Sequence, residues 1–581
     1  MAASPSWPVA PTSPKPKLHG RAFYESLGSP KFVVAPMVDQ SEFAWRMLTR
    51  SFLTPQENAK LLAYTPMFHA RLFEETPKYR DAHFQATRQP VGTVDADPTT
   101  PFLDGNSQLD RPLFVQFCAN DPDHLLRAAQ MVAPYCDAVD LNLGCPQGIA
   151  RKGHYGAFLQ EDQELIYKLI NNLHKNLPIP VTAKIRILET KEDTLAYAKN
   201  VLSAGASILT VHGRRREQKG HLTGVADWGY IRYLRENLPK ETVIFANGNI
   251  LQYGDIEKCL EVTGADAVMS AEGNLSDPSV FAAPPPVGKE GREYWRGRDG
   301  KGGYRVDAVF RRYMDILHKY ALEHEPPKRR SLFIVGDDES WLHDTEARDG
   351  DHEEGPVRKK LKQDSANKRS TSPNIVAVRP HLFHLLRHFI SRHTDIRDTL
   401  ARTSPSDMDG MEKVLEMVEK RVAQGLIDYE RTDGKSIEEE PVPKPKSQDK
   451  EPPKDEGANN DIEPEDDPDS SVATVKACKR PWWIAQPIIR PLPKEALAKG
   501  SIKLSKKDKK KQAQEQAATS TTSSTVAIPT TETVNGKAEG NGHTQKVEDE
   551  LPISDEKDGS VSEPPIDPMA PGLTKDALVS G

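Results

Sequence analysis

The chain has 581 residues, too many for one compact core, and its length suggests two to four separate units. Only 37% of the residues are hydrophobic and 47 are prolines, which predicts that a large part of the chain is disordered. The net charge of −7 argues against electrostatic capture of nucleic acid by the chain as a whole.

Cysteine spacing and hydropathy exclude several further classes of protein. Five widely spaced cysteines without a CxxC pair argue against a disulfide framework and against a cysteine-rich zinc site. The N-terminus has no apolar run, and no stretch reaches the roughly 18 apolar residues that a membrane span needs. These features predict an intracellular protein, cytoplasmic or nuclear, without a metal site or membrane association, and imply no protein partner.

In chain order, residues 1–29 form a Pro-rich lead that we expect to be disordered. Over residues 30–285, short apolar runs alternate with amphipathic stretches, which indicates strands and helices in turn. The predicted strands are 32–37, 63–67, 113–118, 138–144, 181–187, 208–212, 243–246 and 267–270. The predicted helices between them include 123–133, 163–173, 194–204, 228–238 and 254–262.

This alternation predicts an α/β fold of the (β/α)8 TIM-barrel type. The rival fold, a doubly wound open sheet, usually has a Gly-rich fingerprint after its first strand, and that position here reads Ala35-Pro-Met-Val-Asp-Gln40. Residues 85–110, rich in Pro, Gly, Thr and Asp, predict a surface loop inserted between the second and third strands.

The region after the barrel predicts a small α-helical domain over residues 300–425. Its expected helices are 306–322, 380–402 and 408–424, interrupted by a charged, disordered insertion at 326–372. Residues 432–475 are an acidic, Pro-rich linker, and residues 498–581 are a low-complexity tail that we expect to be disordered. Between them, we expect segment 476–497 with Trp482-Trp483 to dock on the folded part; base stacking is the alternative.

Polar residues at the predicted strand ends mark the candidate site, because the active face of a barrel is where the strands end. Cys145 follows the fourth strand in a Gly-Cys-Pro turn and is a candidate nucleophile or proton donor, the alternative being a buried small hydrophobe. Lys184 lies in the fifth strand, where a buried cation requires an anionic ligand unless the position is an exposed edge. His212 ends the sixth strand. It is a candidate ligand contact, and the alternative is a core histidine.

The ends of the seventh and eighth strands predict an anion site. Asn247-Gly248-Asn249 and Ser270-Ala-Glu-Gly273 occupy the loops that commonly bind phosphate in barrels, although Asn-Gly-Asn alone is only a turn signal.

Seven motifs together resemble the tRNA-dihydrouridine synthases, most closely the eukaryotic branch acting on D-loop uridines 16 and 17. The resemblance covers residues 30–275 closely and the helical region to about residue 425 loosely. The motifs are Ala35-Pro-Met-Val-Asp-Gln40, Tyr64-Thr-Pro-Met-Phe-His69, Gln116-Phe-Cys-Ala-Asn-Asp121, Asn142-Leu-Gly-Cys-Pro-Gln147, Gly153-His-Tyr-Gly-Ala-Phe-Leu159, Thr210-Val-His-Gly-Arg214 and Phe245-Ala-Asn-Gly-Asn249.

The resemblance implies an FMN enzyme reduced by NADPH or NADH, with hydride passing to C6 of a uracil and Cys145 protonating C5. It implies flavin contacts from Pro36, Met37, Val38, Gln116, Lys184 and His212, phosphate contacts from Asn247, Gly248, Asn249 and the backbone at Ala271 and Glu272, and substrate contacts from Asn142 and Arg214. Bacterial relatives usually have Gly-Arg where this chain has Ala271-Glu272, so we expect backbone contact there. The Gly153-His-Tyr-Gly156 stretch also has larger side chains than many relatives.

The implied partner is tRNA, whose target base must leave its stack to be reached. In the helical domain, Leu382, Leu385, Leu386 and Phe389 predict a packing face, while the Arg and His residues of 381–393 are candidates for phosphate contact. The basic runs 358–362 and 503–511 suit tRNA attraction, a solvated tail or nuclear import equally. The alternatives for the whole chain are a flavin barrel acting on a free pyrimidine and a catalytically silent RNA-binding barrel.

Overall fold

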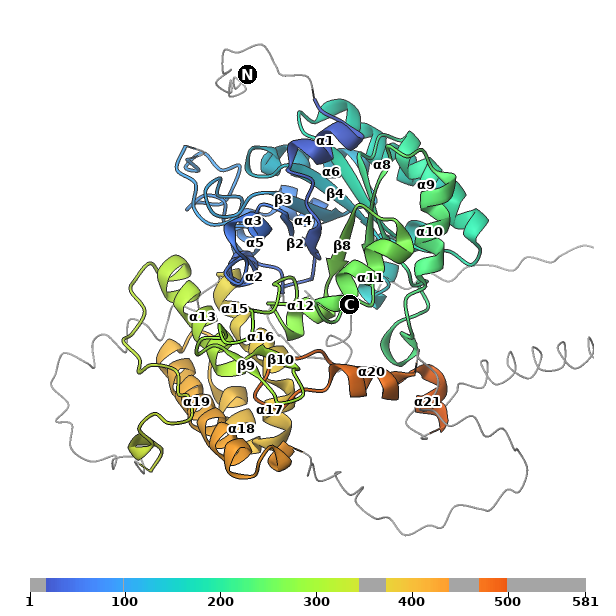
Figure 1. The fold of residues 1–581 in the computed structure, drawn as a ribbon. Helices are drawn as coiled ribbons and strands as arrows, with labels where there is room; N and C mark the ends of the chain where they lie inside the picture. The colour runs from blue at the N-terminus through green and yellow to red at the C-terminus, as the bar shows by residue number, and fades with distance from the viewer. Residues whose placement is uncertain (1–16, 98, 344–371, 438–469, 499–581) are drawn as a thin grey trace, which may run out of the picture. The chain divides into compact units, whose positions relative to one another are not determined.

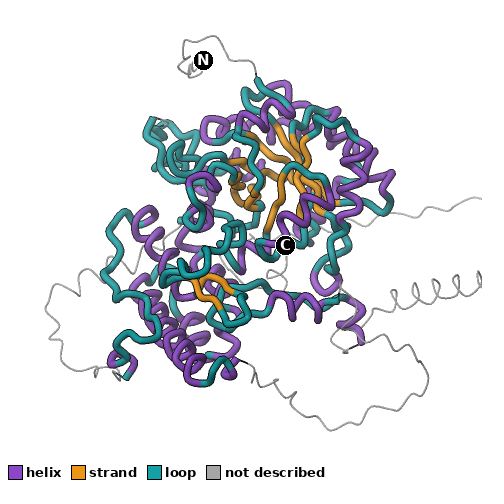
Figure 2. Tube along the Cα trace, viewed as in Figure 1, coloured by secondary structure: helices purple, strands orange, loops and turns teal. Residues whose placement is uncertain are grey.

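Eight parallel strands close into a barrel in the computed structural model of the chain, which describes residues 17–97, 99–343, 372–437 and 470–498 (Figures 1 and 2). Strand β1 pairs with β2 on one side and β8 on the other, which closes the barrel and rules out the open sheet. The strands are β1 (Phe32–Val34), β2 (Leu61–His69), β3 (Leu113–Cys118), β4 (Ala138–Leu143), β5 (Val181–Arg186), β6 (Ile208–His212), β7 (Val243–Asn247) and β8 (Ala267–Ser270).

The two N-terminal strands differ most from their predicted bounds. The first strand ends at Val34, three residues early; Pro36 in the predicted continuation has no N–H to donate to a neighbouring strand. The second strand is longer than predicted at both ends and tolerates Pro66 because its pairing with β3 shifts register between Tyr64 and Met67.

Helices surround the barrel and begin where the sequence supplies caps. The side chains of Asp121, Asp162, Thr190 and Asp227 each accept a hydrogen bond from the first turn of the following helix. The main outer helices are α2 (Phe43–Arg50), α6 (Pro122–Val132), α8 (Gln163–Asn176), α9 (Lys191–Ser203), α10 (Trp228–Asn237) and α11 (Gly254–Thr263).

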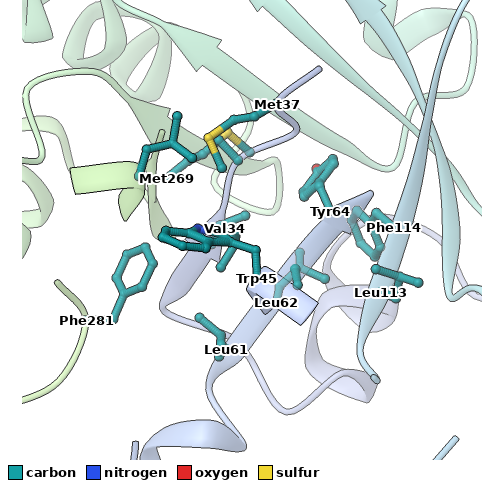
Figure 3. Packing of buried hydrophobic residues seen from close by; sticks show 14 of the residues in the cluster. Val34, Met37, Trp45, Leu61, Leu62, Tyr64, Leu113, Phe114, Met269 and Phe281 are labelled. Atoms are coloured by element: carbon teal, nitrogen blue, oxygen red, sulfur yellow. The ribbon is translucent and has the colours of Figure 1, made fainter. Parts of the chain in front are cut away.

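The barrel strands are buried on both faces, which explains their continuous apolar sequences. Figure 3 shows Val34, Tyr64 and Met269 from three strands among the buried side chains of this core. Burial of each large apolar side chain stabilises the fold by roughly 1.5 to 3 kcal/mol. The site therefore rests on a rigid frame.

The predicted disorder of residues 1–29 is wrong for residues 17–29. Helix α1 (Gly20–Ser26) buries Phe23 and Tyr24, and the Tyr24 hydroxyl lies 3.0 Å from the carbonyl oxygen of Pro30 and 3.1 Å from that of Asp266. Two adjacent aromatic anchors outweigh the Pro-rich composition of the lead. Residues 1–16 lie outside the described part of the chain.

The inserted loop 85–110 has no helix or strand among its described residues, as predicted, but it is tied to the barrel. Its carboxylates Asp104 and Asp110 are buried and pair with Arg46 of α2 at 2.7 and 2.5 Å. This buried ion-pair cluster fixes the loop, because removing one partner would leave an uncompensated buried charge.

The helical region contains α13 (Val306–Ile316), the π-helical turn η4 (Leu317–Ala321), and α15 (Pro373–Val376), α16 (Val378–Leu385), α17 (Arg387–Arg392), α18 (Thr394–Arg402) and α19 (Met408–Arg431). One helix was expected over 380–402, but non-helical dihedrals at Leu386 and His393 divide this stretch. The predicted packing residues Leu382, Leu385, Leu386 and Phe389 are buried. By contrast, His381 is buried, stacks on Trp45 and hydrogen-bonds Glu42, so it is unavailable for RNA contact.

The predicted disorder of the insertion 326–372 is wrong for residues 326–343. Leu332 and Phe333 are buried there, and Arg329 forms an ion pair with Glu412 of α19 at 2.7 Å. The buried apolar pair and the ion pair hold this charged stretch against the helices. Residues 344–371, including the basic run 358–362, lie outside the described residues.

The C-terminal segment contains α20 (Ser471–Cys478) and α21 (Pro493–Ala498), so helix extends into the predicted linker 432–475 and tail 498–581. Trp483, in the segment predicted to dock, is 1% exposed and packs edge-on against Trp295 of β9 (Tyr294–Arg296). Strand β9 pairs with β10 (Gly302–Tyr304) in a small antiparallel sheet. Residues 438–469 and 499–581 lie outside the described part.

Candidate active site at the carboxyl end of the barrel

The strand register arranges the predicted site residues in levels. Asn142, Lys184 and Thr210 are direct neighbours across β4, β5 and β6. One level nearer the carboxyl ends, Arg186 and His212 are paired neighbours, and His212 pairs in turn with Asn247. The barrel therefore brings together residues that are more than 100 positions apart in the sequence.

A buried hydrogen-bond network orients the side chains on β3 and β4. Gln116 Nε2 donates to Asp140 Oδ2 at 2.8 Å, and Asn142 Nδ2 donates to Gln116 Oε1 at 2.8 Å. Thr182 donates to the other oxygen of Asp140 at 2.6 Å, while burial raises the pKa of Asp140 to about 6. The network fixes Gln116 and Asn142 in single orientations.

The turn that carries Cys145 is held from three sides. Asn142 Oδ1 accepts hydrogen bonds from the backbone N–H groups of Gly144 and Cys145, at 3.1 and 2.8 Å. Arg186 Nε donates to the carbonyl of Gly144 at 2.7 Å, and Lys219 Nζ donates to that of Pro146 at 2.6 Å. The backbone around the thiol is thus fixed by side chains from three different loops and strands.

The Cys145 thiol is partly buried beside the small apolar cluster of Cys118, Ala150 and Tyr155. Burial raises the pKa of this thiol, although Arg186, Lys184 and Lys219 oppose the shift. At neutral pH the group is therefore a protonated thiol. It is suited to donate a proton rather than to attack as a thiolate.

Lys184 carries an amine without a hydrogen-bonded partner among the described residues. No hydrogen bond or ion pair joins its Nζ to any other residue that the structure describes. Burial, and then Arg186, lower the pKa of Lys184 to about 7. The charge of Asp140 opposes this shift but forms no ion pair with Lys184, so the amine is available to a negatively charged or electron-rich ligand group.

His212 is a neutral histidine in this environment. It is buried, and its Nε2 accepts a hydrogen bond from Arg214 Nη1 at 3.0 Å, which leaves the proton on Nδ1. Burial holds the pKa of His212 well below its usual range, with Arg186, Lys184 and Arg214 acting in the same direction. The positive charge at this level therefore comes from the lysine and arginines.

Residues at the end of β7 and just after it are tied to β8 and to the loop after β6. Asn247 Nδ2 donates to the carbonyl of Met269 at 3.0 Å, and Asn249 Oδ1 accepts from Arg214 Nη2 at 3.0 Å. Gly248 has a φ of 113°, and a Cβ atom there would lie 2.6 Å from Cβ of Ala226. Only glycine fits this position, because Ala226 and the His212 ring fill the space that a side chain would need.

The remaining predicted residues differ in what they contact. In the sequence after β1, Pro36 is followed by Met37, which is 5% exposed, and by Val38, which is 50% exposed. After β8, Ala271 directly precedes the short helix α12 (Glu272–Ser276). The Glu272 carboxylate accepts a hydrogen bond from Arg490 Nη2 at 2.5 Å.

A cavity of about 600 Å³ lies beside the Cys145 turn. It is lined by Gly148, Arg151, His154, Phe158, Glu161, Arg216, Glu217 and Lys219. Arg216 pairs with both carboxylates of its wall, Glu161 and Glu217, and Arg151 and Lys219 add two further cations, so it suits an anionic ligand of moderate size.

Four contributors to the site were not anticipated from the sequence: Asp140, Arg186, Lys219 and Arg490. Asp140 and Arg186 lie two residues from Asn142 and Lys184 on the same strands, so the period of two along a strand could have identified them. Lys219 and Arg490 have no such local signal.

In the described part of the chain, no group of three or more His, Cys, Asp or Glu residues is placed to hold a metal ion. None of the helices in the described ranges is long and apolar enough to span a membrane.

Comparison with known proteins shows the family of this chain. Residues 33–295 match the family described as dihydrouridine synthase (Dus). The chain is 46% identical over 410 residues to the tRNA-dihydrouridine(16/17) synthase [NAD(P)(+)] of Saccharomyces cerevisiae, across 70% of this chain and 78% of that protein. It is 40% identical over 477 residues to the protein of the same name from Schizosaccharomyces pombe, across 82% of this chain and 92% of that protein.

A mouse protein named tRNA-dihydrouridine(16/17) synthase [NAD(P)(+)]-like is 45% identical over 275 residues, across 47% of this chain and 52% of its own length. The two yeast matches extend far beyond the barrel, so the helical region is shared as well. By these matches, this chain belongs to the dihydrouridine synthase family.

Proposed function

We propose that this chain reduces uridines 16 and 17 in the D-loop of tRNA to dihydrouridine, using NADPH or NADH as reductant and FMN as cofactor. The names of the two yeast relatives support the substrate and the reductant. The observation that carries the proposal is the anchored, protonated thiol of Cys145 on the same barrel face as the amine of Lys184, which has no hydrogen-bonded partner within the described ranges.

The residues at the barrel mouth fit FMN. Lys184 would supply positive charge beside the electron-accepting ring, and the backbone at residues 247–249, with Arg214 bonded to Asn249, would face the phosphate. Pro36, Met37 and Val38 would line the ring, and Gln116, whose amide has one N–H beyond its bond to Asp140, would bond its edge. His212 would contact the ring as a neutral group, and the backbone of residues 247–249 and 271–272 would hold the phosphate.

When bound, FMN would supply the hydride that adds to C6 of the uracil. Cys145 donates its proton to C5, so that hydride and proton together saturate the C5–C6 double bond. The resulting thiolate lies close to Lys184, Arg186 and Lys219, which stabilise its charge until it takes a proton from solvent. Asn142 holds the thiol in place through the backbone of the turn, and Arg214, which bonds His212, is a candidate substrate contact.

The target base must leave its stack to reach Cys145. The cavity beside the turn, with Arg151, His154, Arg216 and Lys219 in its wall, would take the flanking phosphates. The helical region would hold the rest of the tRNA through exposed arginines such as Arg387 and Arg392.

Absorbance spectra of the purified full-length protein, followed by NADPH oxidation assays, test this function. We expect a yellow protein with a flavin spectrum that oxidises NADPH faster with unmodified tRNA than with free uridine. A colourless protein without flavin would contradict the enzyme assignment. Equal turnover of tRNA and free uridine would contradict the assignment of tRNA as substrate.

A further inference from the structure

The segment 480–490 connects the helical region to the mouth of the barrel, and its path is fixed by backbone contacts. The Val306 N–H donates to the carbonyl of Trp483, and the Ala485 N–H donates to that of Tyr304, both at 2.9 Å. Further along, His388 Nε2 lies 3.2 Å from the carbonyl oxygen of Pro487. These contacts determine where the segment ends.

Gln486 stiffens the segment from within, and Trp483 anchors it. The Gln486 side chain is buried and donates to the carbonyls of Arg480 and Pro481, at 3.1 and 2.9 Å. Trp483 is buried against Trp295 and Tyr429. The segment therefore holds Arg490 at a defined place in the structure.

That place is the end of the eighth strand. Arg490 donates to the carboxylate of Glu272, the first residue after Ala271, and both side chains are about one-third exposed. Arg214, from the loop after β6, lies close enough that the charges of Glu272 and Arg490 both shift its pKa. Two arginines and one glutamate thus gather where the loops after β6, β7 and β8 meet.

The charges decide what this cluster can bind. With Arg490 present, its charge cancels that of Glu272, and Arg214 leaves the cluster positive. Without Arg490, an unpaired carboxylate would stand beside the loops in which barrels commonly bind phosphate. A dianionic phosphate at these loops would then meet like charge, a repulsion that lowers affinity.

We propose that Arg490, supplied by the C-terminal segment, completes the phosphate end of the cofactor site by neutralising Glu272 and adding a guanidinium beside Arg214. The inference rests on the proposed function, since it takes FMN as the ligand. It makes the segment 480–490 part of the cofactor site, which therefore extends beyond the barrel.

Flavin binding to the full-length chain, stripped of bound flavin, tests the inference. The dissociation constants of FMN and of riboflavin, which lacks the phosphate, are measured by flavin fluorescence for the wild type and for Arg490→Ala. We expect Arg490→Ala to weaken FMN binding roughly tenfold or more, as expected for loss of a charge-assisted contact, and to leave riboflavin binding unchanged. Arg232→Ala, which removes the arginine of the Arg232–Glu236 ion pair on α10, is the matched control and should bind both flavins as the wild type does.

The double variant E272Q/R490A examines the charge argument. It should recover part of the lost FMN affinity, because it removes the repulsive carboxylate without restoring the guanidinium. Equal FMN affinity of Arg490→Ala and wild type would overturn the inference, and so would a double variant no tighter than Arg490→Ala. A wild-type chain that binds neither flavin would overturn the proposed function itself, which separates the two failures.

Discussion

Asn142 accepts a hydrogen bond from the backbone N–H of Cys145 at 2.8 Å, while its own amide nitrogen donates to Gln116. One side chain thus connects the thiol to the polar network inside the barrel. The position of Cys145, the proposed proton donor, is set by a residue that does not itself transfer a proton.

We expect Asn142→Ala to slow uridine reduction ten- to a hundredfold, roughly the cost of misplacing a reacting group by about 1 Å. Flavin content should fall little, because Asn142 is not among the proposed flavin contacts. Single-turnover rates with reduced enzyme and unmodified tRNA measure the effect, with Asn237→Ala on the outside of α10 as control. A normal rate of uridine reduction in Asn142→Ala would show that the turn needs no such anchor.

The lowered pKa of Lys184 predicts that the stability of the protein depends on pH. Its pKa is about 7 in the folded chain and 10.5 in the unfolded chain, so above pH 7 the unfolded chain binds an extra proton and stability rises with pH until about 10.5. Below pH 7 the penalty for the buried charge is fully present. Lys184→Met removes that penalty and should stabilise the flavin-free protein by roughly 1 to 3 kcal/mol at pH 6.

The gain from Lys184→Met should shrink at pH 9, where the wild-type lysine is already neutral in the folded chain. Thermal unfolding of both proteins at the two pH values provides the measurement. The same gain at pH 6 and pH 9 would mean that Lys184 keeps an ordinary pKa.

Gly248→Ala should lower FMN retention, because the added Cβ atom would displace the backbone at residues 247–249 and the His212 ring. A Cβ atom at this position meets Ala226 at 2.6 Å and the His212 ring at 3.2 Å, and the φ of 113° disfavours any other residue. The flavin-to-protein ratio after gel filtration reports the loss. Gly254→Ala, where a Cβ atom meets nothing within 4 Å, should retain flavin normally, and equal retention in both variants would argue against a phosphate cradle at residues 247–249.

Trp483→Ala should destabilise the protein by roughly 3 to 5 kcal/mol, as expected when a fully buried tryptophan is truncated. The lost contacts include those with Trp295 and Tyr429, so the C-terminal segment should also become sensitive to protease. Trp341→Ala, at a partly buried position, should lower the free energy of unfolding by less. If Trp483→Ala matched wild type in both measurements, the segment would not be a structural part of the protein.

The sequence predicted the barrel well because each strand is a short apolar run bounded by turns, and strand order alone places Cys145, Lys184 and His212 on one face. Predictions failed where tertiary contacts override composition. The composition of residues 17–29 predicts disorder, but Phe23 and Tyr24 are buried and order the segment. The composition of residues 326–343 also predicts disorder, but the ion pair between Arg329 and Glu412 holds that stretch in place.

Contacts across long stretches of chain could not be inferred from local pattern. The pairing of Arg490 with Glu272 joins residues 218 positions apart, and the bond from Lys219 to the Pro146 carbonyl spans 73 positions. Neither has a periodic signal, because both depend on how loops and the C-terminal segment fold back on the barrel.

The most direct test maps dihydrouridine at single-nucleotide resolution in unmodified tRNA incubated with NADPH and the purified full-length protein. Wild type should convert uridines 16 and 17, whereas Cys145→Ala should still oxidise NADPH yet leave both uridines intact, because hydride without a proton cannot complete the reduction. Dihydrouridine at these positions with Cys145→Ala at the wild-type rate would contradict the assignment of Cys145 as proton donor, and its absence with wild type would contradict the proposed function.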